Sequence, residues 1–199
     1  VRSFGTNNLP DCSNMCHESS GTALIDSIGI GKGSVTVDDL IQADLIVIAG
    51  QNPGTNHPRM LSTLEKAKAN GAKIIAVNPL PEAGLIRFKD PQKVHGVVGA
   101  GIPIADEFVQ IRLGGDMALF AGVGRLLLEA QDKAGPHVQI VDRDFVSSHT
   151  AGFEDWERQT RAVDLDTVLA ATGITREQLD RVAEMMAASQ RTIVCWAMG

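Results

Sequence analysis

Short apolar runs alternate with amphipathic stretches along much of this 199-residue chain. Residues 44–50 (Asp-Leu-Ile-Val-Ile-Ala-Gly) and 73–77 (Lys-Ile-Ile-Ala-Val) are continuous apolar runs, a pattern typical of strands buried on both faces. Between them, residues 58–71 place apolar side chains on one helical face, after a proline and before a glycine. These segments predict a β-α-β unit with parallel strands and a right-handed crossover.

The same alternation continues and predicts an α/β fold, a Rossmann-like, doubly wound, mainly parallel sheet with flanking helices. Residues 2–20 and 80–106 lack periodicity and are predicted as loops, with a helix expected near Gly21. The capping-box spacing at Thr175 predicts another helix start. The remaining expected elements are strands at 107–113 and 192–196 and helices at 35–43, 117–132, 142–149, 153–161 and 164–171.

Net charge and cysteine content bear on which partners and which cellular compartment are expected for this chain. The chain has 18 Lys and Arg against 24 Asp and Glu, a formal net charge of −6, which argues against nucleic-acid binding through phosphate neutralisation. No apolar run is long enough to predict a membrane span. Three cysteines are too few for a disulfide scaffold and favour a reducing, cytoplasmic compartment. Because the chain starts at Val1 and ends just after a predicted strand, we expect residues 1–199 to be one domain excised from a larger enzyme.

Three polar loops are predicted at one edge of the sheet. Ligands of open parallel sheets bind outside the carboxyl ends of the strands, and helix N-termini there can receive a phosphate. On spacing alone, a nucleotide site and a set of tight turns and caps are equally good interpretations. Neither GxGxxG nor a Walker A sequence is present, so an ordinary Rossmann NAD site and a P-loop are not supported. The candidate binding residues are Gly50, Gln51, Asn52, Pro53, Thr55, Asn56 and His57, then Asn78 and Pro79, then Gly114, Gly115 and Asp116.

A second candidate site lies near the start of the chain, where Cys16 is followed by His17. A thiolate is a strong ligand for soft or high-valent metals, and a neighbouring helix N-terminus favours the anion. The alternative is one buried cysteine and one reduced surface cysteine, with no chemistry at either Cys12 or Cys16. A zinc site is not supported, because Cys12 and Cys16 lack a second ligand pair, and Cys195 in an apolar strand is expected in the core.

Taken together, these motifs resemble the molybdopterin oxidoreductase family, and most closely the alpha subunits of formate dehydrogenases and formate dehydrogenase-like oxidoreductases. The resemblance runs in order along nearly the whole chain. The matching motifs are Gly5-Thr-Asn-Asn8, Cys12, Met15-Cys16-His17, Gly50-x-Asn52-Pro53 with His57-Pro58, Asn78-Pro79, Gly114-Gly115-Asp116 with Ala118-Leu119, Asp142-Arg-Asp-Phe-Val146, Thr150-x-Gly-Phe-Glu154 and Trp196-Ala-Met-Gly199.

The resemblance implies a function for both sites. Cys16 matches the residue that ligates molybdenum or tungsten, and His17 matches a histidine associated with proton transfer as formate is oxidised to carbon dioxide. The three loops match those that hold one guanine dinucleotide of bis-molybdopterin guanine dinucleotide. Asn78-Pro79 stands where Asp-Pro-Arg is more usual, so this strand end loses a carboxylate acceptor for the ribose or the guanine. The segment 80–106 is also longer than is usual.

The resemblance also implies missing parts. The amino-terminal [4Fe–4S] domain and the carboxy-terminal cofactor domain are absent, so we expect the chain alone to be inactive and to lack a complete molybdenum centre. Formate is the expected small-molecule substrate, and the electron acceptor is not specified. Two other hypotheses stay open: a nucleotide-binding regulatory module without redox catalysis, and a structural domain in which Cys16 lies far from the three loops.

Overall fold

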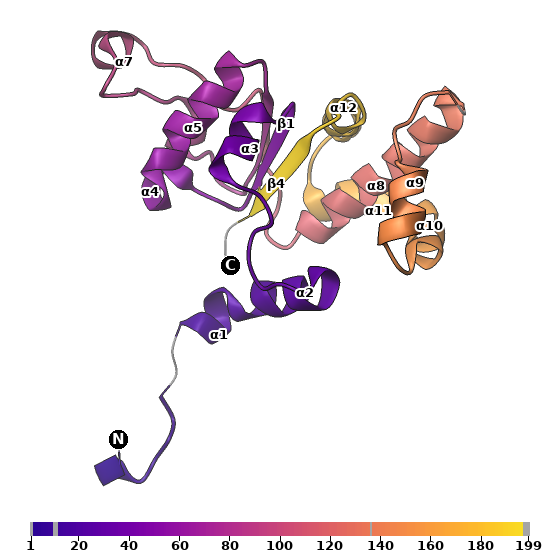
Figure 1. The fold of residues 1–199 in the computed structure, drawn as a ribbon, viewed down its shortest axis with the longest axis horizontal. Coiled ribbons are helices and arrows are strands. Elements are labelled where there is room, and N and C mark those ends of the chain that lie inside the picture. Colours follow the sequence, from indigo (N-terminus) through magenta and orange to yellow (C-terminus); the bar gives the residue numbers. More distant parts are fainter. Residues whose placement is uncertain (1, 10–11, 136, 197–199) are drawn as a thin grey trace.

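The computed structural model describes residues 2–9, 12–135 and 137–196, and its centre is a four-stranded sheet (Figure 1). The strands lie in the order β3-β2-β1-β4 and all neighbours are parallel. The predicted α/β fold with a parallel sheet is therefore confirmed. The strands are β1 (Leu45–Ala49), β2 (Lys73–Val77), β3 (Glu107–Val109) and β4 (Thr192–Trp196).

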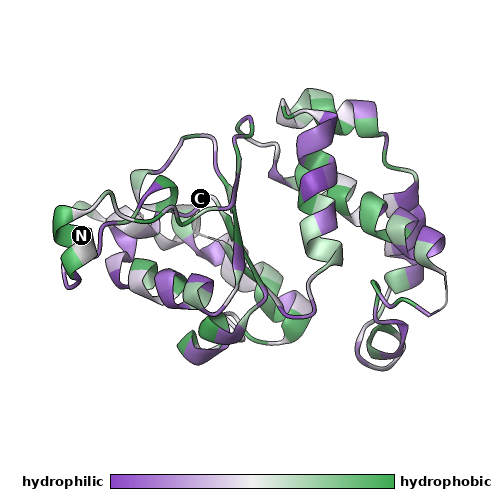
Figure 2. Cartoon of the chain, turned by 90° about the horizontal axis from the view of Figure 1, so that it is seen from above, coloured by the Kyte–Doolittle hydropathy of each residue, from purple (hydrophilic) through white to green (hydrophobic). Residues whose placement is uncertain are grey.

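The sheet is covered on both faces, as expected for a doubly wound fold. Ile46 and Ile48 of β1 belong to a core with α5 (Pro58–Ala69), and α3 (Val37–Gln42) packs beside α5. Leu45 and Val47 of the same strand point into the opposite core. That core is completed by α8 (Asp116–Ala134), α11 (Leu165–Thr172) and α12 (Arg176–Ala187). Figure 2 shows hydrophobic and hydrophilic residues alternating along the turns of the helices, the pattern of amphipathic elements.

Two predicted helix starts are confirmed by side-chain caps. The hydroxyl of Thr36 accepts a hydrogen bond from the Asp39 amide at 3.3 Å, and the Asp39 carboxylate accepts from the Thr36 amide at 2.7 Å, which together form a capping box at α3. At α12 the hydroxyl of Thr175 accepts from the Gln178 amide at 3.2 Å. The predicted helices α9 (Arg143–His149) and α10 (Phe153–Arg161) are also present.

The two segments predicted as loops contain short helices, so those predictions are wrong in part. The first contains η1 (Arg2–Phe4), α1 (Ser13–Cys16) and the beginning of α2 (Glu18–Ile28), so the helix expected near Gly21 begins earlier, at Glu18. The second contains α6 (Ala83–Ile86) and α7 (Val94–Val98). An antiparallel bridge between Phe88 and Ile102 closes the base of the α7 segment. These helices are too short to show a clear apolar period in the sequence.

The strand β3 is shorter than predicted, because the chain leaves the sheet after Val109. The amide of Arg112 donates to the carbonyl of Thr172 at 2.8 Å, which directs the backbone toward the end of α11. A contact between residues so far apart in sequence leaves no local pattern. The predicted strand 107–113 therefore ends early, and Leu113 is exposed.

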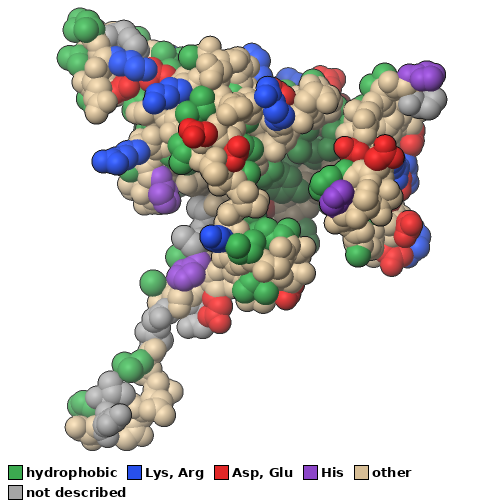
Figure 3. Space-filling view, in the orientation of Figure 1, with side chains coloured by type: hydrophobic (Ala, Val, Ile, Leu, Met, Phe, Trp, Pro, Cys, Tyr) green, Lys and Arg blue, Asp and Glu red, His purple; other side chains and the backbone are tan. Residues whose placement is uncertain are grey.

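The strand β4 is an edge strand, and its side chains are less buried than those of β1 and β2. Val194 and Trp196 keep 40% and 49% of their surface exposed. Figure 3 shows hydrophobic side chains inside a hollow between the body that carries α5 and the helices on the right of the view. Within the described part of the chain, no helix is both long and apolar enough to cross a membrane.

An ion-pair network fastens α9 and α10 to α8. Arg143 donates to both carboxylate oxygens of Glu157 at 2.8 and 2.9 Å, and Arg161 donates to Glu157 at 2.8 Å and to Asp132 at 2.6 Å. The hydrogen bonds from Arg143 and then Arg161 lower the pKa of Glu157 from its ordinary 4.5 to about 2. The charged carboxylate therefore stabilises the folded state above pH 4.5.

We expect this stabilisation to be lost as the pH falls from 4.5 to about 2, where Glu157 becomes protonated in the folded state. Since the pair is partly solvent-screened, the contribution is about 1–2 kcal/mol in the free energy of unfolding. Urea unfolding across this pH range should show a steeper loss for the wild type than for Glu157→Gln. Glu154→Gln, at an exposed glutamate of the same helix, is the matched control. Equal pH slopes for the wild type and Glu157→Gln would contradict this assignment.

Candidate functional site

Two of the predicted loops are joined to neighbouring strands at the carboxyl edge of the sheet. The amide of Gly50 donates to the carbonyl of Val77 at 2.8 Å, and the amide of Asn78 donates to the carbonyl of Val109 at 3.1 Å. Gly50 has a positive φ of 67°, a conformation that favours glycine, and this lets the chain turn away directly after β1. The loops after β1 and β2 therefore start side by side.

Two of the candidate residues, Gln51 and Asn78, are buried and hold the loops together. The amide nitrogen of Gln51 lies 3.3 Å from Nδ1 of His57 and 3.5 Å from the sulfur of Met60. Asn78 donates to the Gln51 carbonyl at 3.5 Å and accepts from the Leu80 amide at 3.4 Å. Their amides are used within the protein, so these residues shape the edge.

The predicted first loop contains a helical turn, α4 (Pro53–Asn56), which Asn52 caps. The Asn52 carbonyl oxygen accepts from the Thr55 amide at 3.2 Å, and its amide nitrogen donates to the carboxylate of Glu82, just before α6. Gly54 and Gly84 allow this contact, because a Cβ on Gly84 would lie 3.1 Å from the Gly54 Cα. No sequence signal indicates Glu82, because this residue lies in the aperiodic segment 80–106 and contacts Asn52 only through the tertiary fold.

Other candidate residues present groups to solvent at this edge. Thr55, Asn56 and His57 are exposed, and Pro53 is buried as the first residue of α4. The carbonyl of Pro79 accepts from the Gln110 side chain at 2.9 Å. In the third loop, Gly114 has a φ of 79°, Gly115 is buried at the start of α8, and Asp116 is exposed in its first turn.

The second candidate site lies on the α1–α2 segment. Cys16 is half-buried at the end of α1, and His17 is exposed between the two helices. As predicted, Cys16 lies just before a helix N-terminus, although α2 begins at Glu18 instead of near Gly21. In the described part of the chain, no hydrogen bond or ion pair links the side chains of Cys16 or His17 to the three loops.

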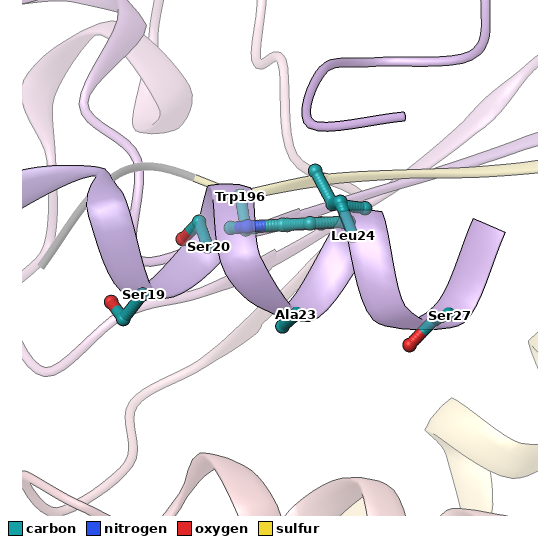
Figure 4. A pocket seen from close by; sticks show the side chains of 6 residues that line it. All are labelled: Ser19, Ser20, Ala23, Leu24, Ser27 and Trp196. Carbon is teal, nitrogen blue, oxygen red and sulfur yellow. The ribbon is translucent and has the colours of Figure 1, made fainter. Parts of the chain in front are cut away.

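The helix α2 lies against the end of β4, with an open groove of about 520 Å³ between them (Figure 4). Trp196 pairs in register with Ala49, the last residue of β1, so this groove lies at the edge where the Gly50 loop begins. Figure 1 shows α1 and α2 on the side of the sheet where β4 ends. The end of the motif at residues 197–199 lies outside the described residues. The groove is lined by Ser19, Ser20, Ala23, Leu24, Ser27 and Trp196.

The third cysteine differs from Cys16 in its surroundings. Cys195 is half-buried and packs against the core that contains α5, and burial raises the pKa of its thiol. Cys195 therefore lies at the margin of the core, and the expected core position is only partly confirmed. Among the residues that the structure describes, no cluster of three or more His, Cys, Asp or Glu could hold a metal ion.

Comparisons with known proteins find oxidoreductases, the class of enzyme that the sequence motifs resemble. No family model matches this chain. An uncharacterized oxidoreductase of Mycobacterium tuberculosis is 78% identical over 199 residues, which is 100% of this chain. Formate dehydrogenase H of Escherichia coli is 28% identical over 196 residues, or 98% of the chain. This chain is similar to oxidoreductases along its whole length. It spans about a quarter of their length, 25% of the first and 24% of the second.

A solved structure shows the same fold. Acetylene hydratase from Pelobacter acetylenicus matches with a TM-score of 0.70 and 21% identity, over 98% of this chain and 23% of that chain. At this identity the likeness concerns the fold alone. The named relatives support a similarity to oxidoreductases and, more distantly, to a formate dehydrogenase.

Proposed function

We propose that this chain is the central α/β domain of a molybdopterin oxidoreductase, and that the full-length protein oxidises formate. The observation that carries the proposal is the similarity to oxidoreductases along the whole chain, together with ordered motifs that lie at the carboxyl edge of a parallel sheet. In this proposal the edge holds one guanine nucleotide portion of bis-molybdopterin guanine dinucleotide. Cys16 supplies a protein ligand to molybdenum or tungsten.

The chemistry of the edge fits a nucleotide. Exposed hydroxyl, amide and imidazole groups come from Thr55, Asn56 and His57, and the exposed carboxylate of Asp116 can accept from a ribose hydroxyl. The start of α8 offers backbone N–H groups to a phosphate. The start of α5 offers fewer, because Pro58 has no N–H and the Met60 amide is bonded to the His57 carbonyl at 2.8 Å. The buried amides behind these groups keep the loops in a fixed conformation, which lowers the entropic cost of binding.

The residues of this chain then have distinct roles in the reaction. A bound metal and pterin group would supply the acceptor for the two electrons that leave formate as it becomes carbon dioxide. Cys16, as a thiolate, would hold the metal and tune its electronic properties. A ring nitrogen of His17 would take up the proton as a general base, since a neutral imidazole carries one nitrogen that accepts a proton. The three loops orient the nucleotide.

Metal and pterin analysis of the purified full-length protein tests this proposal. We expect molybdenum or tungsten together with a guanine-containing pterin, and formate-dependent reduction of an artificial electron-accepting dye. Guanine nucleotide without metal would instead support the regulatory-module hypothesis. Loaded cofactor without formate-dependent reduction would refute the substrate while leaving the cofactor site in place.

A further inference from the structure

We propose that Glu82 reads the base of the bound nucleotide and selects guanine over adenine. This inference deepens the proposed function and rests on it. It starts from the juxtaposition of the Glu82 carboxylate with the loop after β1, through its contact with Asn52. Nothing in the sequence pattern marked Glu82 as a binding residue.

The Glu82 carboxylate is only partly used by the protein. One oxygen, Oε2, accepts from the amide nitrogen of Asn52. In the region that the structure describes, no Lys, Arg or His side chain forms an ion pair with Glu82, and its other oxygen has no hydrogen-bond donor. The residue is half-buried at the edge where ligands of parallel sheets bind. Because Glu82 is only half-buried, its second oxygen is within reach of solvent and can accept a hydrogen bond from a ligand that donates one.

The polar side chains of Asn78 and Gln51, which lie near Glu82 in the same loops, do not offer a free carboxylate acceptor. The amide of Asn78, at the end of β2, is buried and used by the Gln51 carbonyl and the Leu80 amide. The side chain of Gln51 is turned toward His57 and Met60. A carboxylate acceptor at this part of the edge therefore comes from Glu82, later in the same loop as Asn78.

The position of Glu82 is fixed before any ligand binds. Asn52 is held at both ends of its amide, by the Thr55 backbone and by Glu82 itself. Behind this contact, α4 and α6 approach through Gly54 and Gly84, where a Cβ would meet backbone atoms at 3.1–3.3 Å. A preorganised acceptor discriminates between ligands better than a mobile one.

The two purines differ in the groups that a carboxylate contacts. Guanine presents two adjacent donors, the ring N1–H and the exocyclic amine, which match the two oxygens of a carboxylate. Adenine presents one amine beside an acceptor nitrogen, which a carboxylate repels. Because hydrogen bonds to a charged group are strong, the loss of this pairing lowers affinity by roughly 10-fold to 100-fold.

The test compares GDP and ADP binding by calorimetry to the cofactor-free full-length protein and to its Glu82→Gln variant. Glutamine keeps an acceptor for Asn52 but turns its second group into a donor, so the loop contact is retained while the guanine pairing is lost. Circular dichroism melting should give equal midpoints for both proteins. Glu154→Gln, at an exposed glutamate of α10, is the matched control for the loss of one charge.

We expect the wild type and Glu154→Gln to prefer GDP, and Glu82→Gln to lose roughly 10-fold to 100-fold in GDP affinity without losing ADP affinity. If Glu82→Gln keeps the wild-type preference for GDP, the assignment of base reading to Glu82 is overturned while the nucleotide site stands. If the wild type binds neither nucleotide, the nucleotide site of the proposed function fails, and this inference fails with it.

Discussion

Replacement of Cys16 by alanine in the full-length protein is expected to lower formate-dependent dye reduction by roughly 1000-fold or more. The reason is the loss of the protein ligand to the metal, since alanine has no donor atom. The fold should persist, because Cys16 is only half-buried and lies outside both hydrophobic cores. Initial rates with a dye acceptor measure the effect, and circular dichroism melting checks the fold.

The matched control is Cys12→Ala, at the other cysteine of the same segment. Cys12 is exposed, and its side chain does not cap α1. We expect this variant to keep its activity within about two-fold, as surface substitutions away from a site usually do. Metal analysis completes the comparison. A Cys16→Ala protein that keeps both its metal and its activity would refute the ligand role of Cys16.

Leu64→Ala is expected to lower the free energy of unfolding by about 2–5 kcal/mol. Leu64 has no exposed surface and lies on α5, between the helix face and the strands β1 and β2. The substitution removes buried methyl groups and leaves a cavity that the surrounding side chains fill only in part. Because α5 follows directly after the Gly50–His57 segment, the same change should also weaken GDP binding by the chain.

Urea unfolding followed by circular dichroism measures the effect of Leu64→Ala. Met117→Ala on α8 is the control, since Met117 is 85% exposed and its truncation should change the free energy of unfolding by less than about 0.5 kcal/mol. A change below about 1 kcal/mol for Leu64→Ala would contradict the packing of α5 against the sheet.

The centre of the fold could be predicted from the sequence because its signals are local. The apolar runs of β1 and β2 are continuous, α5 has one apolar face between a proline and a glycine, and Thr175 is followed at the capping-box spacing by Gln178. Each of these features is contained within a few residues, so hydrophobic periodicity and capping chemistry are sufficient to identify them.

The elements that were missed depend on contacts between distant residues. The strand β3 ends early because Arg112 bonds to the carbonyl of Thr172, and α6 lies beside α4 because Gly54 and Gly84 allow their backbones to approach. In the candidate site, the sequence indicated which loops are involved. It did not indicate which of their side chains are buried and which are open to a ligand. Gln51 and Asn78 are buried and hold the edge, whereas Glu82 carries an acceptor that no motif indicated.

The most direct test of the account is a crystal structure of the cofactor-loaded full-length protein, with anomalous diffraction measured at the metal edge. The account predicts that the metal lies bonded to the sulfur of Cys16 and that a guanine nucleotide lies along the loops that begin at Gly50, Asn78 and Gly114. A metal bound away from Cys16, or a nucleotide held at another part of the protein, would contradict it.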